Sequence, residues 1–275
     1  MAKSTQEILV CRPKSLPRSL WIKAAARAAE VNPVNHAPVE RLMRAMPHFA
    51  PTPARIAVVT TKYWRTNGVR LSVGFLDGAE TALKKRILSH MNVWAKKANI
   101  QFVLGGRRSD VRITRMGGFD GGYWSYLGTD IQSIPMDEPT MNLEAFTMST
   151  AESEFKRVVR HETGHTLGCP HEHMRRALVK KIDAKKAIAY FKRTDGWSAA
   201  ETRQQVLTPI EEGSLLGTPH PDPRSIMCYQ IPGAITKSGK PIVGGADINT
   251  LDYTFMGTVY PKPGKPKPPS RPRKR

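Results

Sequence analysis

The sequence contains few cysteines, few acidic residues and no long apolar run. Three cysteines in 275 residues, Cys11, Cys169 and Cys228, are too few for a disulfide scaffold. No apolar stretch approaches the roughly 18 residues that a membrane-spanning helix needs, which excludes a transmembrane protein. Hydrophobic residues still make up 40% of the chain, which excludes wholesale disorder and predicts a sizeable core.

The shortage of acid leaves a strongly basic chain. Lys and Arg number 43 against 23 Asp and Glu, for a formal net charge of +20. Residues 261–275 carry seven basic groups, no acid and many prolines, which predicts a basic, disordered tail. The remaining excess is spread along the chain without the aromatic-interleaved patch of an RNA-binding sheet. We interpret it as a solvated basic face, with no specific nucleic-acid site, that favours acidic protein substrates.

The chain divides into an N-terminal extension, a main domain and the tail. Residues 1–55 alternate basic, Ala-rich and Pro-containing stretches and form a possible pro-like segment with a short helix at 19–30. Residues 56–260 form the main domain. We expect its cleft between a larger part, 56–172, and a smaller, irregular part, 173–260.

Hydrophobic periodicity predicts an α+β fold, with a twisted mixed sheet and a helix packed on it. Turn-bounded runs rich in β-branched residues predict strands at 54–64, 69–76, 100–104 and 110–116. The expected helices are residues 80–99, 151–167, 182–194 and 196–207.

The helix at 151–167 ends in the run HETGHTLGCPH, residues 161–171. His161 and His165 are four residues apart, so their rings project from one face of a helix and can share one zinc ion. Gly168 lets the chain leave the helix with a positive φ and double back, so that His171 reaches the same ion. His173 is a rival third ligand, although the spacing from Gly168 favours His171. Glu162 is offset around the helix and is placed to act as a base.

A bare HExxH also occurs by chance on amphipathic helices, but HExxHxxGxxH fixes five positions over eleven residues. This longer run resembles the zinc signature of the metzincin metallopeptidases. The resemblance implies a methionine turn downstream, and PRSIMCYQ at 223–230 is similar to it, with Met227 beneath the three histidines. On its own, a methionine in a loop is more often core filler.

Within the metzincins, the sequence most resembles the astacin family. HEHMR at 171–175, SIMCY at 225–229, YWSYLG at 123–128 and ADINTLDYTFMGTVYP at 246–261 are similar to that family's motifs. The likeness implies a metzincin-type zincin fold and places Tyr229 where the family has a tyrosine that stabilises the transition state. Tyr123 replaces a family cysteine, as in simpler bacterial relatives. The family's pairing of Glu172 with a freed N-terminus has no evident maturation site here.

The function predicted is a zinc-dependent metalloendopeptidase with one catalytic ion. Zinc lowers the pKa of its bound water and polarises the scissile carbonyl, and Glu162 moves the proton. Tyr229 donates to the developing oxyanion, or only packs the methionine turn. The partners are protein or peptide substrates, held along an edge strand that we expect at 130–135 or 141–146. We expect a monomer.

Several alternatives stay open at this point. Cys169 and Cys228 either form a disulfide or stay free. Cys11 could occupy the open zinc position and hold the enzyme latent, but we favour an unpaired cysteine in an irregular segment. The resemblance implies secretion, although the N-terminus lacks the apolar region of a signal peptide. A catalytically silent, metzincin-fold binding protein for anionic partners is the alternative function.

Overall fold

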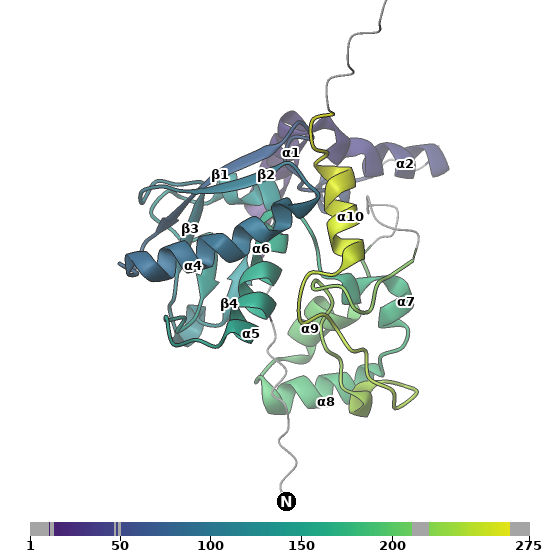
Figure 1. Cartoon of the computed structure of the whole chain (residues 1–275). Helices are drawn as coiled ribbons and strands as arrows, with labels where there is room; N and C mark the ends of the chain where they lie inside the picture. Colours follow the sequence, from purple (N-terminus) through teal and green to yellow (C-terminus); the bar gives the residue numbers. More distant parts are fainter. Residues whose placement is uncertain (1–10, 12–13, 47, 49–50, 211–219, 265–275) are drawn as a thin grey trace, which may run out of the picture.

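The computed structural model describes residues 11, 14–46, 48, 51–210 and 220–264. Most of the expected basic tail, residues 265–275, lies outside this part. In the part of the chain described, no helix is both long and apolar enough to cross a membrane. Figure 1 shows a sheet with its helices on one side of the molecule and a mainly helical, looped region on the other.

The sheet has five strands in the order β2-β1-β3-β5-β4. The strands are β1 (Val69–Phe75), β2 (Ile100–Leu104), β3 (Val111–Thr114), β4 (Tyr123–Ser125) and β5 (Met141–Leu143). The first four in the spatial order are parallel, and β4 pairs antiparallel with β5, which makes the sheet mixed as predicted. The central β3 is buried on both faces, as its run of Val and Ile favours.

The edge strand beside the site is β4, at Tyr123–Ser125. The prediction of 130–135 or 141–146 for this role was wrong. Residues 128–133 form a 3₁₀ segment, η5 (Gly128–Ser133), and β5 is covered on both edges by β3 and β4. Strand β4 has only three residues and lies between glycine-containing turns. Its alternation of apolar and polar residues is therefore too short to be recognised in the sequence.

Helix α4 (Thr81–Asn92) and the helix that carries His161, α6 (Arg160–Thr166), pack on the sheet. The other helices are α1 (Trp21–Val31), α2 (Ala37–Ala45), α3 (Pro53–Val59), α5 (Glu152–Glu154), α7 (Arg176–Val179), α8 (Ala184–Thr194), α9 (Ala199–Thr202) and α10 (Thr250–Val259). Single-turn segments include η1 (Arg18–Leu20), η2 (Pro33–His36), η3 (Val93–Lys96), η4 (Gly118–Asp120), η6 (Phe155–Val159), η7 (Glu172–Met174), η8 (Arg203–Leu207) and η10 (Gly233–Ile235).

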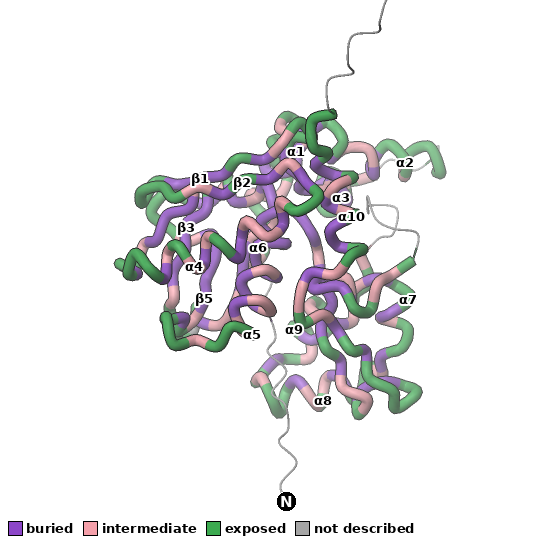
Figure 2. The backbone as a smooth tube through the Cα atoms, in the orientation of Figure 1, coloured by how far each residue is buried: buried purple, intermediate pink, exposed green. Residues whose placement is uncertain are grey.

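Two hydrophobic cores hold the fold together. The larger lies between the sheet and helices α4, α6 and α10, and includes Ile87, Phe155 and Met227. The smaller lies among α7, α8 and the loops after residue 226, and includes Phe191 and Tyr229. Figure 2 shows both as buried stretches of chain enclosed by exposed ones.

The extension contributes helices that pack on the main domain. Residues 53–59 are the helix α3, where we predicted a strand starting at residue 54. The β-branched run favoured a strand, but the Thr52 side chain caps the first turn and Pro53 fits the first helical position. Asn32 and Asn35 are buried and hydrogen-bond the main chain of Trp64 and Tyr63, which ties this helical unit to the sheet domain.

Candidate metal centre and active site

The helix predicted at 151–167 is interrupted by a wider turn. After α5, the chain makes one π-helical turn, η6 (Phe155–Val159), and then continues as α6. Such single π-helical turns within α-helices occur frequently at functional sites. All residues from His161 to Thr166 are buried.

Three imidazoles meet at one point. The Nε2 atom of His171 lies 3.1 Å from that of His161 and 3.0 Å from that of His165. The Nδ1 atoms of His161 and His165 lie 2.6 and 2.7 Å from the carbonyl oxygens of Ile226 and Cys169. A carbonyl only accepts, so each Nδ1 carries the proton and each Nε2 presents a bare lone pair to the centre.

The turn after α6 brings His171 into the cluster. Gly168 has a φ of 95°, as predicted from its position, and its N–H donates to the His165 carbonyl. A Cβ at Gly168 would lie 2.9 Å from the Tyr63 ring, so a glycine is required for space as well. His173 stays outside the cluster: its Nε2 lies 3.1 Å from the Gln205 carbonyl and its ring stacks on Tyr229.

Cys11 lies at the same centre. Its Sγ, with the ligand atoms of the three histidines, forms a group in which all the atoms are within 4.8 Å of one another. Its thiol also lies 3.5 Å from Glu162 Oε2, and the residue is 5% exposed. Cys11 is unpaired, as we favoured, but its place beside the three histidines supports the alternative that it occupies the open zinc position. Residues 11 and 162 are 151 positions apart, and no local pattern links them.

Glu162 is 1% exposed and lies beside this group. Burial raises the pKa of its carboxyl to about 8. Burial also raises the pKa of the Cys11 thiol, and the Glu162 carboxylate adds to that rise. Burial lowers the pKa of His161 to about 4, so this imidazole is neutral and able to bind a metal at neutral pH.

Tyr229 borders the centre from the smaller core. Its ring centroid is 4.3 Å from that of His171, and its hydroxyl donates to the Cys11 carbonyl oxygen. Burial raises the pKa of the phenol well above its usual value, so the group is a neutral donor. The Tyr229 hydroxyl therefore donates to a main-chain carbonyl beside the histidine cluster.

Met227 lies against the helix that carries the histidines. A Cβ at Gly164 would be 2.3 Å from Met227 Sδ, so only glycine allows this approach. We did not single out Gly164 from the sequence. A signal was present, because a glycine inside a helix costs about 1 kcal/mol and then indicates close packing.

Asp252, which we also did not single out, holds the methionine turn in place. Its carboxylate accepts from the Ser225 hydroxyl at 2.6 Å and from the Ile226 N–H at 3.1 Å. Asp252 is itself fixed in the first turn of α10 by a capping box with Asn249. The Asn-x-x-Asp spacing of that box was the available signal.

All three cysteines are free and buried. Cys169 packs in the larger core and Cys228 in the smaller one, so the disulfide that we left open is not formed. Burial raises the pKa of both thiols, that of Cys169 well above its usual value, which makes them unreactive.

A cleft of about 750 Å³ opens beside His161 and Glu162. One wall comes from Tyr123 of β4 and from residues 152–158, and the other from residues 226–230 and 245–247. Its acids are already paired: Glu154 with Arg157, Asp247 with Arg160, and Glu152 with Arg86.

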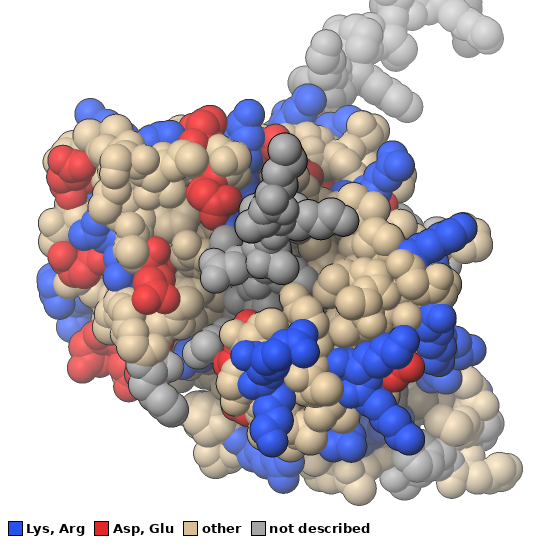
Figure 3. Space-filling view, turned by 90° about the horizontal axis from the view of Figure 1, so that it is seen from below, with Lys and Arg blue, Asp and Glu red and all other residues tan. Residues whose placement is uncertain are grey.

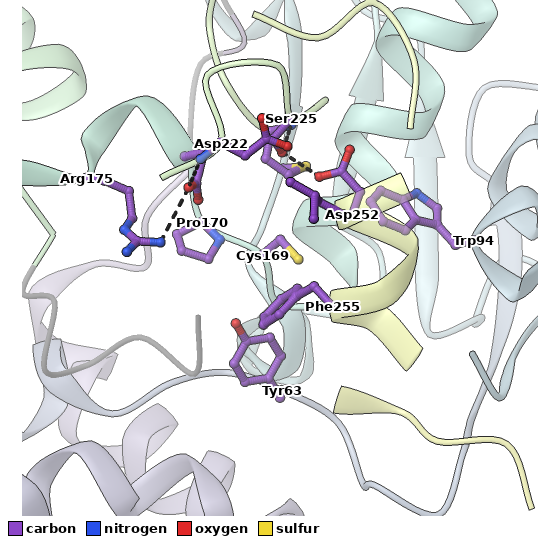
Figure 4. Close-up of a pocket in the computed structure, with 12 residues that line it drawn as sticks. Tyr63, Trp94, Cys169, Pro170, Arg175, Asp222, Ser225, Asp252 and Phe255 are labelled. Atoms are coloured by element: carbon purple, nitrogen blue, oxygen red, sulfur yellow. Dashed lines mark hydrogen bonds and ion pairs between the residues drawn. The ribbon is translucent and has the colours of Figure 1, made fainter. Parts of the chain in front are cut away.

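A second pocket lies on the far side of the methionine turn. Figure 4 shows Tyr63, Cys169 and Phe255 at one end and Asp222, Ser225 and Asp252 at the other. Glu172 also lines it, and accepts from the Asp222 N–H at 2.9 Å and from Arg175 at 3.4 Å. Glu172 thus has partners within the described chain.

The donor set fits a zinc ion. Three neutral imidazole nitrogens and one sulfur make a four-ligand set of the kind zinc prefers. The Nε2 atoms of His161 and His165 both face the Nε2 atom of His171, at 3.1 and 3.0 Å. Tetrahedral zinc with bonds of about 2.0–2.1 Å to nitrogen sets the ligand atoms roughly 3.3 Å apart, close to these distances.

Comparison with solved structures gives two informative matches. A structure of myroilysin is 31% identical and superposes with a TM-score of 0.68, and the match covers 74% of this chain and 97% of the myroilysin chain. A crystal structure of myroilysin is 32% identical with a TM-score of 0.55, over 74% of this chain and 87% of that chain.

A more distant match is high choriolytic enzyme 1, a hatching enzyme zinc-protease from the medaka fish Oryzias latipes. It is 18% identical with a TM-score of 0.49, over 74% of this chain and 94% of that chain, and is too distant to carry an argument. The sequence matches no family model and no curated protein.

Proposed function

Since the chain belongs to the astacin family of metzincin metallopeptidases, whose members are zinc proteases, we propose that it is a zinc endopeptidase held latent by its own Cys11. The observation that carries the proposal is the convergence of three histidine Nε2 atoms beside the buried carboxyl group of Glu162. His161, His165 and His171 would hold the ion. The bound zinc would supply Lewis-acid activation of the scissile carbonyl and of the attacking water.

The chain's own residues then move the protons. Glu162 takes the proton of the water as the water attacks the carbonyl carbon, and delivers it to the leaving amine when the C–N bond breaks. Tyr229 donates a hydrogen bond to the oxygen on which negative charge develops. Its present bond to the Cys11 carbonyl supports this role, because a substrate carbonyl would occupy similar space.

Latency is supported by the segment that follows Cys11. Lys14 forms an ion pair with Asp120 at 3.0 Å and lies 4.8 Å from the Trp124 ring, so the segment crosses the outer side of β4. Leu16 packs beside Ile134. Substrate must reach both the cluster and this edge, so we propose that the segment 11–20 leaves before the enzyme acts.

The cleft supports the division of the main domain that we propose. Its walls come from residues before His171 on one side and from residues after 225 on the other. The extension is proposed to have two parts: a removable segment that ends before α1, and the helices α1 to α3, which stay with the domain.

Metal analysis of the purified chain tests the site. We expect one zinc per chain in the unmodified protein and in Glu162→Ala, and loss of zinc in His161→Ala and His165→Ala. Zinc retained by both histidine variants at the wild-type level would overturn the proposed ligand set.

A further inference from the structure

A cluster of positive charge lies on one face of the described chain. Between residues 175 and 193 the sequence has eight basic residues and one acid, Asp183. Figure 3 shows Lys and Arg gathered on the side of α7 and α8, whereas acidic and basic groups alternate on the opposite side of that view.

Nine exposed cations make up this surface, which we call the basic face. They are Arg176, Lys180, Lys181, Lys185, Lys186, Lys192, Arg193, Lys237 and Lys240.

The topology brings these residues together from two segments. The Lys237 N–H donates to the Lys181 carbonyl at 2.8 Å, and Ile182 pairs with Thr236. The loop at 237–240 therefore lies beside the turn between α7 and α8. On α8, Lys185 and Lys192 are seven residues apart, which places them on one face about 10 Å from each other.

The cations of the basic face lack acidic partners. None of the nine forms a salt bridge with any residue that the structure describes, whereas Arg86, Arg115, Arg157 and Arg160 on the sheet side all do. Asp183, the acid within the run, caps α8 with its side chain. Within the part of the chain that the structure describes, the basic face therefore carries an excess of positive charge without ion-pair partners.

The active-site cleft has no such excess of positive charge, and three of its acids are paired with arginines. The residues that line it include four acids, Glu152, Glu154, Glu162 and Asp247, against two bases, Lys156 and Arg157. None of the nine cations lines the cleft. Any attraction of the nine cations for an acidic substrate therefore acts outside the cleft.

We propose that the basic face is an exosite that binds an acidic tract of the polypeptide substrate, at a distance from the bond that is cut. The inference rests on the proposed function, since it takes the substrate to be a polypeptide. The face is the outer surface of the core that holds Tyr229, so a substrate bound there lies on the same part of the molecule as one side of the cleft.

An acidic polypeptide fits this face better than a nucleic acid does. The aromatic residues of this region offer no stacking platform: Phe191 and Trp197 are buried, and the half-buried Tyr190 lies beneath Arg193. Seven of the nine cations are lysines, whereas arginine is the residue of choice for phosphate and nucleic-acid recognition. Helix α8 is about 16 Å long, so a tract of five or more extended residues spans it.

The test measures binding apart from catalysis. A labelled peptide of twelve glutamates is titrated by fluorescence anisotropy against the full chain carrying Glu162→Ala, beside a neutral peptide of equal length. The exosite variant adds Lys180→Glu, Lys181→Glu, Lys185→Glu and Lys186→Glu. A matched control reverses four exposed cations elsewhere: Lys23→Glu, Arg65→Glu, Lys85→Glu and Arg108→Glu.

We expect the exosite variant to lose at least tenfold in affinity for the glutamate peptide and the control to lose less than twofold. The same four lysines changed to glutamine give a second variant that avoids new charge, and should lose about threefold or more. Equal losses in the exosite and control variants would overturn the proposal, because they would reflect net charge alone. Duplex DNA binding more tightly than the peptide by tenfold would also overturn it.

Cleavage distinguishes this inference from the proposed function. With the activated enzyme, kcat/KM should rise when an acidic tract is fused to a cleavable peptide, and the rise should vanish in the exosite variant. Cleavage with no effect of the tract would refute the exosite and leave the peptidase in place. Tract binding without any cleavage would refute the peptidase and leave the binding surface in place.

Discussion

Asn35 connects the N-terminal helices to the domain, and its replacement by alanine should be costly. The side chain is fully buried. Its amide donates to the Ala28 and Tyr63 carbonyls at 2.8 and 2.7 Å, and its oxygen accepts from the Tyr63 N–H and the Thr61 hydroxyl, both at 2.8 Å. Removing it leaves both main-chain groups of Tyr63 without this partner in a buried place.

A typical hydrogen bond contributes about 1 kcal/mol, and a buried polar group left unsatisfied costs about 1–3 kcal/mol. We therefore expect Asn35→Ala to lower the free energy of unfolding by roughly 3–5 kcal/mol, measured by urea denaturation followed by circular dichroism. Lys23→Ala, an exposed change on α1, should alter it by less than about 0.5 kcal/mol. A loss below 1 kcal/mol for Asn35→Ala would refute the view that the extension is an integral part of the fold.

Three further predictions follow from the same contacts. Gly164→Ala should destabilise the protein by about 1–3 kcal/mol because its Cβ would meet Met227 Sδ at 2.3 Å, and it should do so more than Gly257→Ala, where the nearest atom is 3.0 Å away; equal losses in thermal unfolding would contradict the close approach. Replacing zinc by cobalt(II) should give a thiolate-to-metal charge-transfer band that Cys11→Ser lacks, and identical spectra would exclude Cys11 as a ligand. Burial raises the pKa of Asp130 to about 6, above its unfolded value of about 3.9, although the nearby charge of Lys62 opposes the rise. The folded state therefore binds this proton more tightly, and the free energy of unfolding should fall by up to about 3 kcal/mol as the pH rises from roughly 4 through 6. In the variant Lys62→Met/Asp130→Asn neither group titrates, so its free energy of unfolding should lack the decrease that Asp130 causes. Identical pH profiles of this free energy in the variant and the unmodified protein would contradict the prediction.

The features that the sequence could predict were local ones. The spacing of His161, His165 and Gly168 is set by one helix and one turn, and the structure places these residues accordingly. The strands β1, β2 and β3 followed from short runs rich in β-branched residues that turn residues bound. Each of these signals lies within about ten residues of chain, where helix and strand geometry alone fixes direction.

The features that the sequence could not predict depend on distant contacts. Cys11 lies at the cluster, and the segment after it contacts distant parts of the chain, Lys14 with Asp120 and Trp124 and Leu16 with Ile134. The strand predicted from residue 54 is a helix because Thr52 and Pro53 begin one that packs on α1. The basic face joins residues from α7, α8 and the 237–240 loop, so its charge looks evenly spread when it is counted along the chain.

The central claim is that Glu162 and a bound metal hydrolyse peptide bonds once Cys11 no longer occupies the metal site. The most direct measurement is the digestion of an unfolded protein by zinc-loaded Cys11→Ser, with and without a metal chelator, beside Cys11→Ser/Glu162→Ala. The account predicts cleavage that the chelator stops and that falls by at least a thousandfold in the double variant, while both proteins hold zinc. Cleavage that persists in the double variant, or none by the zinc-loaded single variant, would contradict it.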